Sequence, residues 1–160
     1  GGTLTASAGN LKLVGKWNDD DFWYEPAAVT AELADVVAEY AGDTDLVPKS
    51  LPAGYLFGDV EVFIDESFIS ISSFFYKIED NETNKLYIDY RIYLNNNKVP
   101  FFDKDYTDVI KYSLNDIDHY IMGNLGIVSA NWQNGNIEGS IKGTLCIDDV
   151  KQIIDSIYGE

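Results

Sequence analysis

Apolar side chains repeat at helical spacing in two parts of the chain, one in its first third and one at its end. In the segment 27–40 the repeating residues are Val29, Leu33, Val36, Val37 and Tyr40. Pro26 suits the first turn of a helix here, and Gly42 suits its end. In the last segment the repeating residues are Ile147, Val150, Ile153, Ile154 and Ile157. Both segments are predicted to be helices with one buried face.

Between these segments the hydrophobic period changes to two, which is the period of a strand with one buried face. The alternation is clearest from Leu86 to Leu94. Strands are predicted at 60–64, 68–78, 86–94, 108–114, 117–122, 127–132 and 137–145. Asn134 and Gly135 separate the last two strands and predict a type I′ hairpin turn, because both residue types tolerate positive φ.

This order of elements predicts an α+β fold. We expect a curved antiparallel sheet of about six strands, with the N-terminal and C-terminal helices packed on one face or end. The 160 residues, 46% of them hydrophobic, are enough for one well-buried core. We therefore expect an N-terminal arm at 1–25 and a single domain at 26–160. Residues 1–9 are small and polar, as in a linker or a tag remnant.

The chain is strongly acidic, with 27 Asp and Glu against 11 Lys and Arg and a net charge of -16. This charge repels phosphate backbones and anionic membrane surfaces, which argues against a nucleic-acid partner. The sequence has no run of 18 apolar residues, so we expect membrane association only through an anchor outside it. Cys146 is the single cysteine, which excludes an internal disulfide.

An aromatic cluster interleaved with carboxylates is the predicted ligand- or partner-binding site. Its residues are Trp17, Phe22, Trp23 and Tyr24, around the acidic run 19–21. Such side chains stack on sugars and hydrogen-bond to them, or anchor a protein interface. The alternative is that they fasten the arm over the sheet. The expected partner is an unknown protein, small molecule or glycan.

Tyr87, Tyr93 and Tyr120 occupy the polar phase of their predicted strands. They form a second candidate aromatic surface, or else they support cross-strand pairs.

The residues that could catalyse a reaction or bind a metal lack the neighbouring motifs that such sites require. His119 is the single histidine and is in phase with Ile117 and Ile121 of a strand, without a nucleophile motif nearby. Cys146 is expected to be a small buried hydrophobe. The acidic clusters, such as Asp43 with Asp45, lack the spacing of a calcium-binding loop. We expect no catalytic residue, no metal and no cofactor.

Several short motifs, taken in order, resemble a family of uncharacterised domains, DUF4367. They are the segment 47–55 (VPKSLPAGY), Trp132 before a hairpin, the strand 137–143, and the segment 148–157. Two positions depart from the family pattern: Ala53 replaces a common acidic residue, and Cys146 stands near a usual Ser or Thr cap. The resemblance covers about 47–157.

The resemblance implies an extracytoplasmic domain of a membrane-anchored or lipoprotein-type protein of Gram-positive bacteria, with no assigned activity. We therefore expect a non-enzymatic binding or sensory domain. One alternative is a carrier of an apolar ligand in a cavity between sheet and helices, as in lipoprotein carriers. This alternative follows from the strand 68–78, which is apolar on both faces. Another is a small hydrolase that uses carboxylates or His119.

Overall fold

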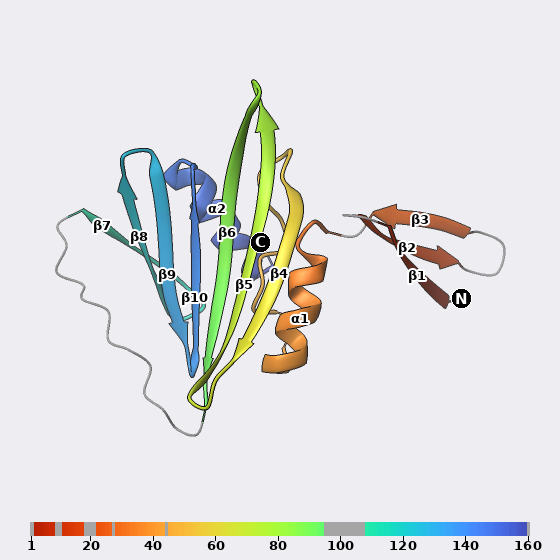
Figure 1. Ribbon diagram of the computed structural model, residues 1–160, viewed down its shortest axis with the longest axis horizontal. Helices are drawn as coiled ribbons and strands as arrows, with labels where there is room; N and C mark the ends of the chain where they lie inside the picture. Colours follow the sequence, from red (N-terminus) through yellow and green to blue (C-terminus); the bar gives the residue numbers. More distant parts are fainter. Residues whose placement is uncertain are drawn as a thin grey trace.

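A seven-stranded antiparallel sheet with two helices on one side forms most of the computed structural model (Figure 1). The structure describes residues 28–43, 45–94 and 108–159, and before them only the backbone of three strands. The helices are α1 (Ala31–Ala41) and α2 (Ile147–Ile157). The strands of the sheet are β4 (Leu56–Ile64), β5 (Phe68–Glu79), β6 (Glu82–Tyr93), β7 (Val109–Leu114), β8 (Ile117–Asn124), β9 (Ile127–Asn134) and β10 (Ile137–Gly143). The predicted α+β class is confirmed, with seven strands in this sheet instead of about six.

Two meanders meet in the middle of the sheet, whose strand order is β4-β5-β6-β10-β9-β8-β7. The first meander is β4-β5-β6 and the second is β7-β8-β9-β10. They are joined by the antiparallel pairing of β6 with β10, in which Ile88 lies opposite Ile141. Each of these two strands is therefore the last of its meander, and β7, β8 and β9 separate them in the sequence.

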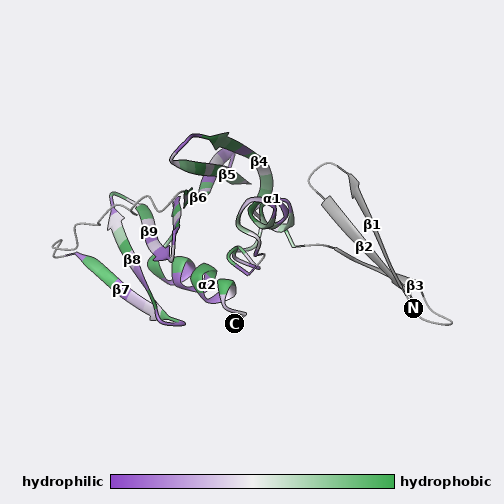
Figure 2. Ribbon diagram, turned by 90° about the horizontal axis from the view of Figure 1, so that it is seen from below, coloured by the Kyte–Doolittle hydropathy of each residue, from purple (hydrophilic) through white to green (hydrophobic). Residues whose placement is uncertain are grey.

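Both helices lie on the same side of the sheet (Figure 2), and the side chains between the helices and this face form the apolar core. Helix α1 lies against β4 and β5, and α2 lies against β8 and β9. The fully buried residues between the layers include Leu33 and Val37 of α1, Ile71 and Phe75 of β5, Leu86 and Ile88 of β6, and Ile153 and Ile154 of α2. This apolar face explains the period-two pattern that predicted the strands.

A β-bulge hid the first part of β4 from the sequence pattern. The pairing of β4 with β5 shifts register between Phe57 and Asp59, which leaves Gly58 as an extra residue. A Cβ atom at position 58 would lie 2.2 Å from Cε2 of Phe74, so the close approach requires glycine. Because the bulge interrupts the alternation, the predicted strand began only at Val60.

Two-residue turns connect most of the neighbouring strands. Residues 80–81, 115–116 and 125–126 all have positive φ at both positions, as a type I′ turn requires. The last hairpin differs from the prediction. Asn134 pairs with Ile137, so the turn residues are Gly135 and Asn136, and only Gly135 has positive φ. This is the pattern of a type II′ turn, shifted by one residue from the predicted type I′ turn at 134–135.

The first 27 residues contain three strands that the sequence pattern did not predict. They are β1 (Gly2–Ala8), β2 (Leu11–Trp17) and β3 (Phe22–Pro26), which form an antiparallel sheet in that order. Pro26, predicted to open the first helix, ends β3, and α1 begins at Ala31. Gly42 follows α1 in the left-handed conformation, as expected.

Leu125 holds the left-handed conformation at the tip of the β8–β9 hairpin, with φ of 51° and 97% of its surface exposed. This conformation costs a bulky L-residue about 1–2 kcal/mol, and Asn tolerates it better. We expect Leu125→Asn to raise the free energy of unfolding by about 1 kcal/mol, measured by thermal and urea denaturation. Leu125→Ala, which keeps a Cβ without the Asn side chain, is the control. An unchanged or lower stability of Leu125→Asn would contradict this account.

Candidate functional site

The predicted aromatic binding cluster lies outside the residues whose side chains the structure describes. Trp17 ends β2, and Phe22, Trp23 and Tyr24 belong to β3, where Trp17 pairs with Phe22. Their backbone register therefore brings the two parts of the cluster to one end of a hairpin. The acidic runs at 19–21 and 103–105 also lie outside the described residues.

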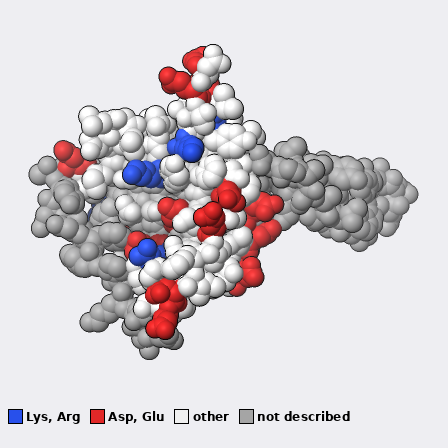
Figure 3. Space-filling view, in the orientation of Figure 1, with Lys and Arg blue, Asp and Glu red and all other residues white. Residues whose placement is uncertain are grey.

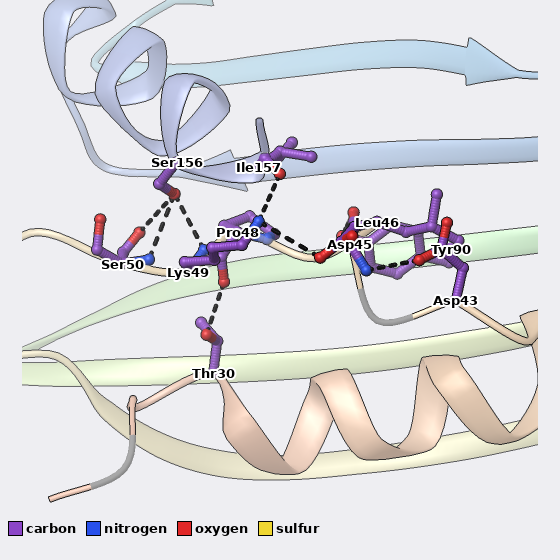
Figure 4. A network of polar contacts seen from close by, with 10 residues as sticks. All are labelled: Thr30, Asp43, Asp45, Leu46, Pro48, Lys49, Ser50, Tyr90, Ser156 and Ile157. Carbon is purple, nitrogen blue, oxygen red and sulfur yellow. Dashed lines mark hydrogen bonds and ion pairs between the residues drawn. The ribbon is translucent and has the colours of Figure 1, made fainter. Parts of the chain in front are cut away.

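The segment that carries the family resemblance is a structural strap between the two helices. Residues 45–55, called the strap below, run between the start of α1 and the end of α2 (Figure 4). Val47 and Tyr55 of the strap are buried in the core. The strap thus closes the apolar face of the sheet where neither helix covers it.

Polar groups from both helices and the sheet hold the backbone of the strap. Thr30, just before α1, donates a hydrogen bond from Oγ1 to the carbonyl of Pro48 at 2.6 Å. Ser156 Oγ of α2 accepts hydrogen bonds from the amides of Lys49 and Ser50, at 3.1 and 3.3 Å. Tyr90 of β6 donates to the carbonyl of Leu46 at 2.9 Å. Buried backbone groups need such partners, so these side chains have a structural role.

Lys49 adds a charged contact at the end of α2. Its Nζ donates to the carbonyl of Ile157 at 2.8 Å, where a cation complements the helix dipole. Asp45 lies 3.9 Å from the same Nζ and also bonds through its amide to Asp43 Oδ1. The side chains of Asp43 and Asp45 therefore belong to a local turn. The described residues contain no group of three or more His, Cys, Asp or Glu arranged to hold a metal ion.

His119 is buried between β8 and α2, with protein partners at both ring nitrogens. Nδ1 lies 2.9 Å from the carbonyl oxygen of Tyr112, and Nε2 lies 2.7 Å from the hydroxyl of Tyr158. Because a carbonyl only accepts, Nδ1 carries the proton and Nε2 accepts from the hydroxyl. Burial lowers the pKa of His119 and raises the pKa of Tyr158 to about 12. The imidazole of this neutral pair packs beside Trp132, so the two groups serve as hydrogen-bond partners within the core.

The prediction that Cys146 is buried is wrong, because the thiol is exposed. Cys146 is the N-cap residue of α2, and its Sγ accepts a hydrogen bond from the amide of Asp149 at 3.4 Å. It therefore occupies the cap position that the resemblance assigns to Ser or Thr.

The other face of the sheet carries no helix and holds a second set of side chains (Figures 1 and 3). The strand registers align one residue from each strand in a row across this face. From β4 to β7 the row is Glu61, Ser72, Asp89, Ser140, Asn131, Tyr120 and Lys111. Most of these side chains are polar. Figure 3 shows basic and acidic side chains close together on this face.

A groove of about 790 Å³ is open on this helix-free face. Among the described residues its polar lining includes Asp89, Ser129, Asn131, Ser140 and Lys142, and its apolar lining includes Tyr87, Met122 and Ile127. Two smaller hollows, of about 330 and 250 Å³, lie beside it and also contain Asp89. Asp89 is therefore common to all three hollows.

The groove exists because small side chains lie between larger ones. Ser72 and Ser140 are the direct neighbours of Asp89 on β5 and β10. On one side of Asp89 the Lys85 ammonium lies over the Phe74 ring, 5.3 Å from its centroid. On the other side the Arg91 guanidinium lies 4.3 Å from the centroid of Phe68. These larger groups stand on both sides of the row of small residues.

Asp89 is an unusual carboxylate for this position. It is partly buried, and its Oδ1 accepts one hydrogen bond, from the amide of Ser73 at 3.2 Å. The described residues provide no cation within ion-pair distance of it. Burial raises the pKa of Asp89, and the Ser73 amide only partly offsets this effect. A charge held without a counter-ion beside a groove marks a candidate functional residue.

The sequence analysis found part of this site. It placed Tyr87, Tyr93 and Tyr120 on the polar phase of their strands, and the registers confirm that they share the helix-free face. Tyr87 is 41% exposed, whereas Tyr93 is buried and donates to Glu138 Oε2 at 3.1 Å. Asp89 was missed, since one carboxylate among 27 acidic residues carries no signal without its neighbours.

Comparison with known proteins identifies one family. The model of a family described as a domain of unknown function (DUF4367) matches residues 45–157, which confirms the resemblance predicted from the sequence motifs. The match begins at the strap and ends with α2. No curated protein and no solved structure matches the chain. Within the described residues, neither helix is long and apolar enough to span a membrane.

Ser156 provides a test of the strap. Ser156→Ala leaves the amide of Ser50 without this acceptor in a part-buried site, and it leaves the amide of Lys49 only the backbone carbonyl of residue 156, at 3.4 Å. We expect a loss of about 1–3 kcal/mol in the free energy of unfolding, measured by urea denaturation. Ser72→Ala, at an exposed position on the helix-free face, is the control and should change stability by at most about 0.5 kcal/mol. Equal effects of the two substitutions would contradict the role of the strap.

His119 should make stability depend on pH. Its pKa in the folded protein lies below the 6.5 of a free side chain, so the unfolded chain binds more protons near and below that pH. The contribution of His119 to the free energy of unfolding is therefore full above about pH 6.5 and is lost as the pH falls below this value. We expect His119→Gln to flatten the decline in unfolding free energy between about pH 7 and 5. Parallel pH profiles of the two proteins would show that the pKa of His119 is the same in the folded and unfolded states, which would contradict this account.

Proposed function

The chain belongs to the DUF4367 family, and from this membership we propose that it is a non-enzymatic extracytoplasmic binding or sensory domain that binds its ligand on the helix-free face. The single observation that carries the proposal is the groove around Asp89. Its lining combines aromatic, hydroxyl, amide and charged groups, as binding sites for small molecules do.

One face of the sheet is covered and forms the core, whereas the helix-free face stays open. This difference favours a binding role for the helix-free face. The helix face is covered by α1, α2 and the strap, and its side chains belong to the core. The helix-free face retains an exposed Tyr87 and, at Asp89, a carboxylate that accepts one amide hydrogen bond and has no ion-pair partner among the described residues. A carboxylate whose pKa is raised by burial lowers the stability of the folded state at neutral pH. Groups that cost stability are often retained for function.

The hydrolase alternative has little support among the described residues. His119 is the single histidine of the chain, and both its nitrogens are engaged by Tyr112 and Tyr158 inside the core. It is therefore poorly placed to act as a general base on a ligand. Asp89 lies on the opposite face of the sheet and has no described histidine beside it.

The apolar-carrier alternative is also less favoured by the packing. The described side chains between sheet and helices form one continuous apolar cluster, in which Phe75, Leu33 and Ile154 are fully buried. The hollows described above open instead on the helix-free face. The polar lining of the groove favours a ligand with hydrogen-bonding groups over a lipid-like one.

The extracytoplasmic placement is part of the proposal. It follows from the family resemblance. The net charge of -16 repels anionic membrane surfaces, so attachment to an envelope would need an anchor elsewhere in the parent protein. Ligands are then expected among components of the cell envelope.

This function can be tested by amide NMR of the isotope-labelled domain. Polysaccharide and protein fractions of a Gram-positive cell envelope are titrated in, with a cytosolic extract for comparison. We expect an envelope fraction to shift amides around Asp89 on β5, β6 and β10. Ser129→Trp should obstruct the groove and abolish the shifts, whereas Gln152→Trp, on the exposed side of α2, should not. No shifts with any envelope fraction, or shifts confined to the helix side, would refute the proposal.

A further inference from the structure

We infer that the ligand of the groove is an oligosaccharide, which stacks on Tyr87 and donates a hydroxyl hydrogen bond to Asp89. This inference rests on the proposed function and adds the chemical class of the ligand. It is argued from the exposure of Tyr87, the hydrogen-bonding groups in the groove, and the position of the groove within the sheet.

Tyr87 offers a flat apolar surface at the edge of the groove. It stands on a central strand, yet 41% of its surface is exposed. The ring of Phe74, its direct neighbour on β5, is already covered by the Lys85 ammonium. Among the described residues the ring of Tyr87 has no such ring or cation contact. The C–H face of a pyranose ring is apolar and rigid, and it packs well on an uncovered aromatic ring.

The groups beside Tyr87 match the hydroxyls of a sugar. Ser129, Ser140 and Asn131 each both donate and accept hydrogen bonds, as sugar hydroxyls do. Asp89 only accepts, and it has one protein donor, the Ser73 amide. Its remaining acceptor capacity faces the groove. A ligand hydroxyl would supply the missing donor, and a hydrogen bond to a charged acceptor is stronger than one to a neutral acceptor.

The position of the groove argues against a peptide ligand. Peptides that bind sheets usually pair with an exposed edge strand. The groove lies on β6, β10, β9 and β8, which all have paired strands on both sides. Their backbone groups are therefore used within the sheet, and only side chains are available to the ligand. Sugars bind well through side chains alone, since they have no backbone ladder to satisfy.

The charges around the groove argue against a strongly ionic ligand. The hollows that share Asp89 hold Lys142 and Arg91 together with Asp59, Glu61 and Glu138, so both signs are present around the groove and acidic groups are in excess. Nucleic acids and other polyanions would in addition meet the net charge of -16. The groove volume of about 790 Å³ is suited to a ligand larger than one sugar ring.

The test is calorimetric titration of the domain with defined soluble oligosaccharides of about four to six units. The probes are chito-, cello-, manno- and malto-oligosaccharides. We expect at least one series to bind, and Tyr87→Ala and Asp89→Asn each to weaken that binding about tenfold or more. Phe63→Ala is the matched control, because Phe63 is an exposed aromatic residue on the same face that does not line the groove. It should change the affinity by less than about twofold.

A thermal scan separates binding effects from folding effects. Asp89→Asn removes a charge that burial disfavours, so this variant should be at least as stable as the parent at neutral pH. Weaker binding by a stable Asp89→Asn variant supports the inference. Unchanged affinity in both groove variants, or an equal loss with Phe63→Ala, overturns it.

The inference and the proposed function fail in different ways. If none of the oligosaccharides binds while an envelope protein fraction still shifts the amides around Asp89, the ligand class is wrong and the binding face stands. If the oligosaccharides do not bind and no envelope fraction shifts these amides, both are overturned.

Discussion

The structure depends on covering one apolar face of a seven-stranded sheet with only two helices of 11 residues each. The helices leave a gap, and the strap at 45–55 fills it with Val47 and Tyr55. Irregular backbone in such a place needs hydrogen-bond partners. Thr30, Tyr90 and Ser156 provide them from α1, β6 and α2. The family match begins at this strap and ends with α2, which fits a structural reason for its most distinctive motif.

Once one face is committed to the core, the opposite face is free for other uses. Its central strands carry Ser72, Ser140 and Asn131 where larger side chains would give a flat surface. β10 also supplies Ile141 to the core on the other side, and β6, which carries Asp89, supplies Ile88. Alternation along β6 and β10 thus lets one pair of strands hold the domain together and form the groove. On this face Asp89 is partly buried, and burial raises the pKa of its carboxyl group.

Local patterns were enough to predict most of the elements, and their failures have local causes. The bulge at Gly58 broke the alternation of β4, and the last hairpin used Gly135 and Asn136 where 134–135 was expected. Cys146 was expected in the core because free cysteines usually are buried, but it caps α2 at the surface. His119 lies in the core, on the same side of its strand as Ile117 and Ile121, and its two ring nitrogens form hydrogen bonds with Tyr112 and Tyr158.

The sequence by itself determined the α+β class, both helices, the strands of the main sheet and the family. These depend on hydrophobic period and turn residues, which act between near neighbours in the chain. Only the tertiary structure decided which residues meet on the helix-free face. Asp89 is far in sequence from Ser140 and Asn131, and it becomes their neighbour only through the pairing of β6 with β10. Register between distant strands is set by the packing of the whole core, so no local pattern could reveal the groove.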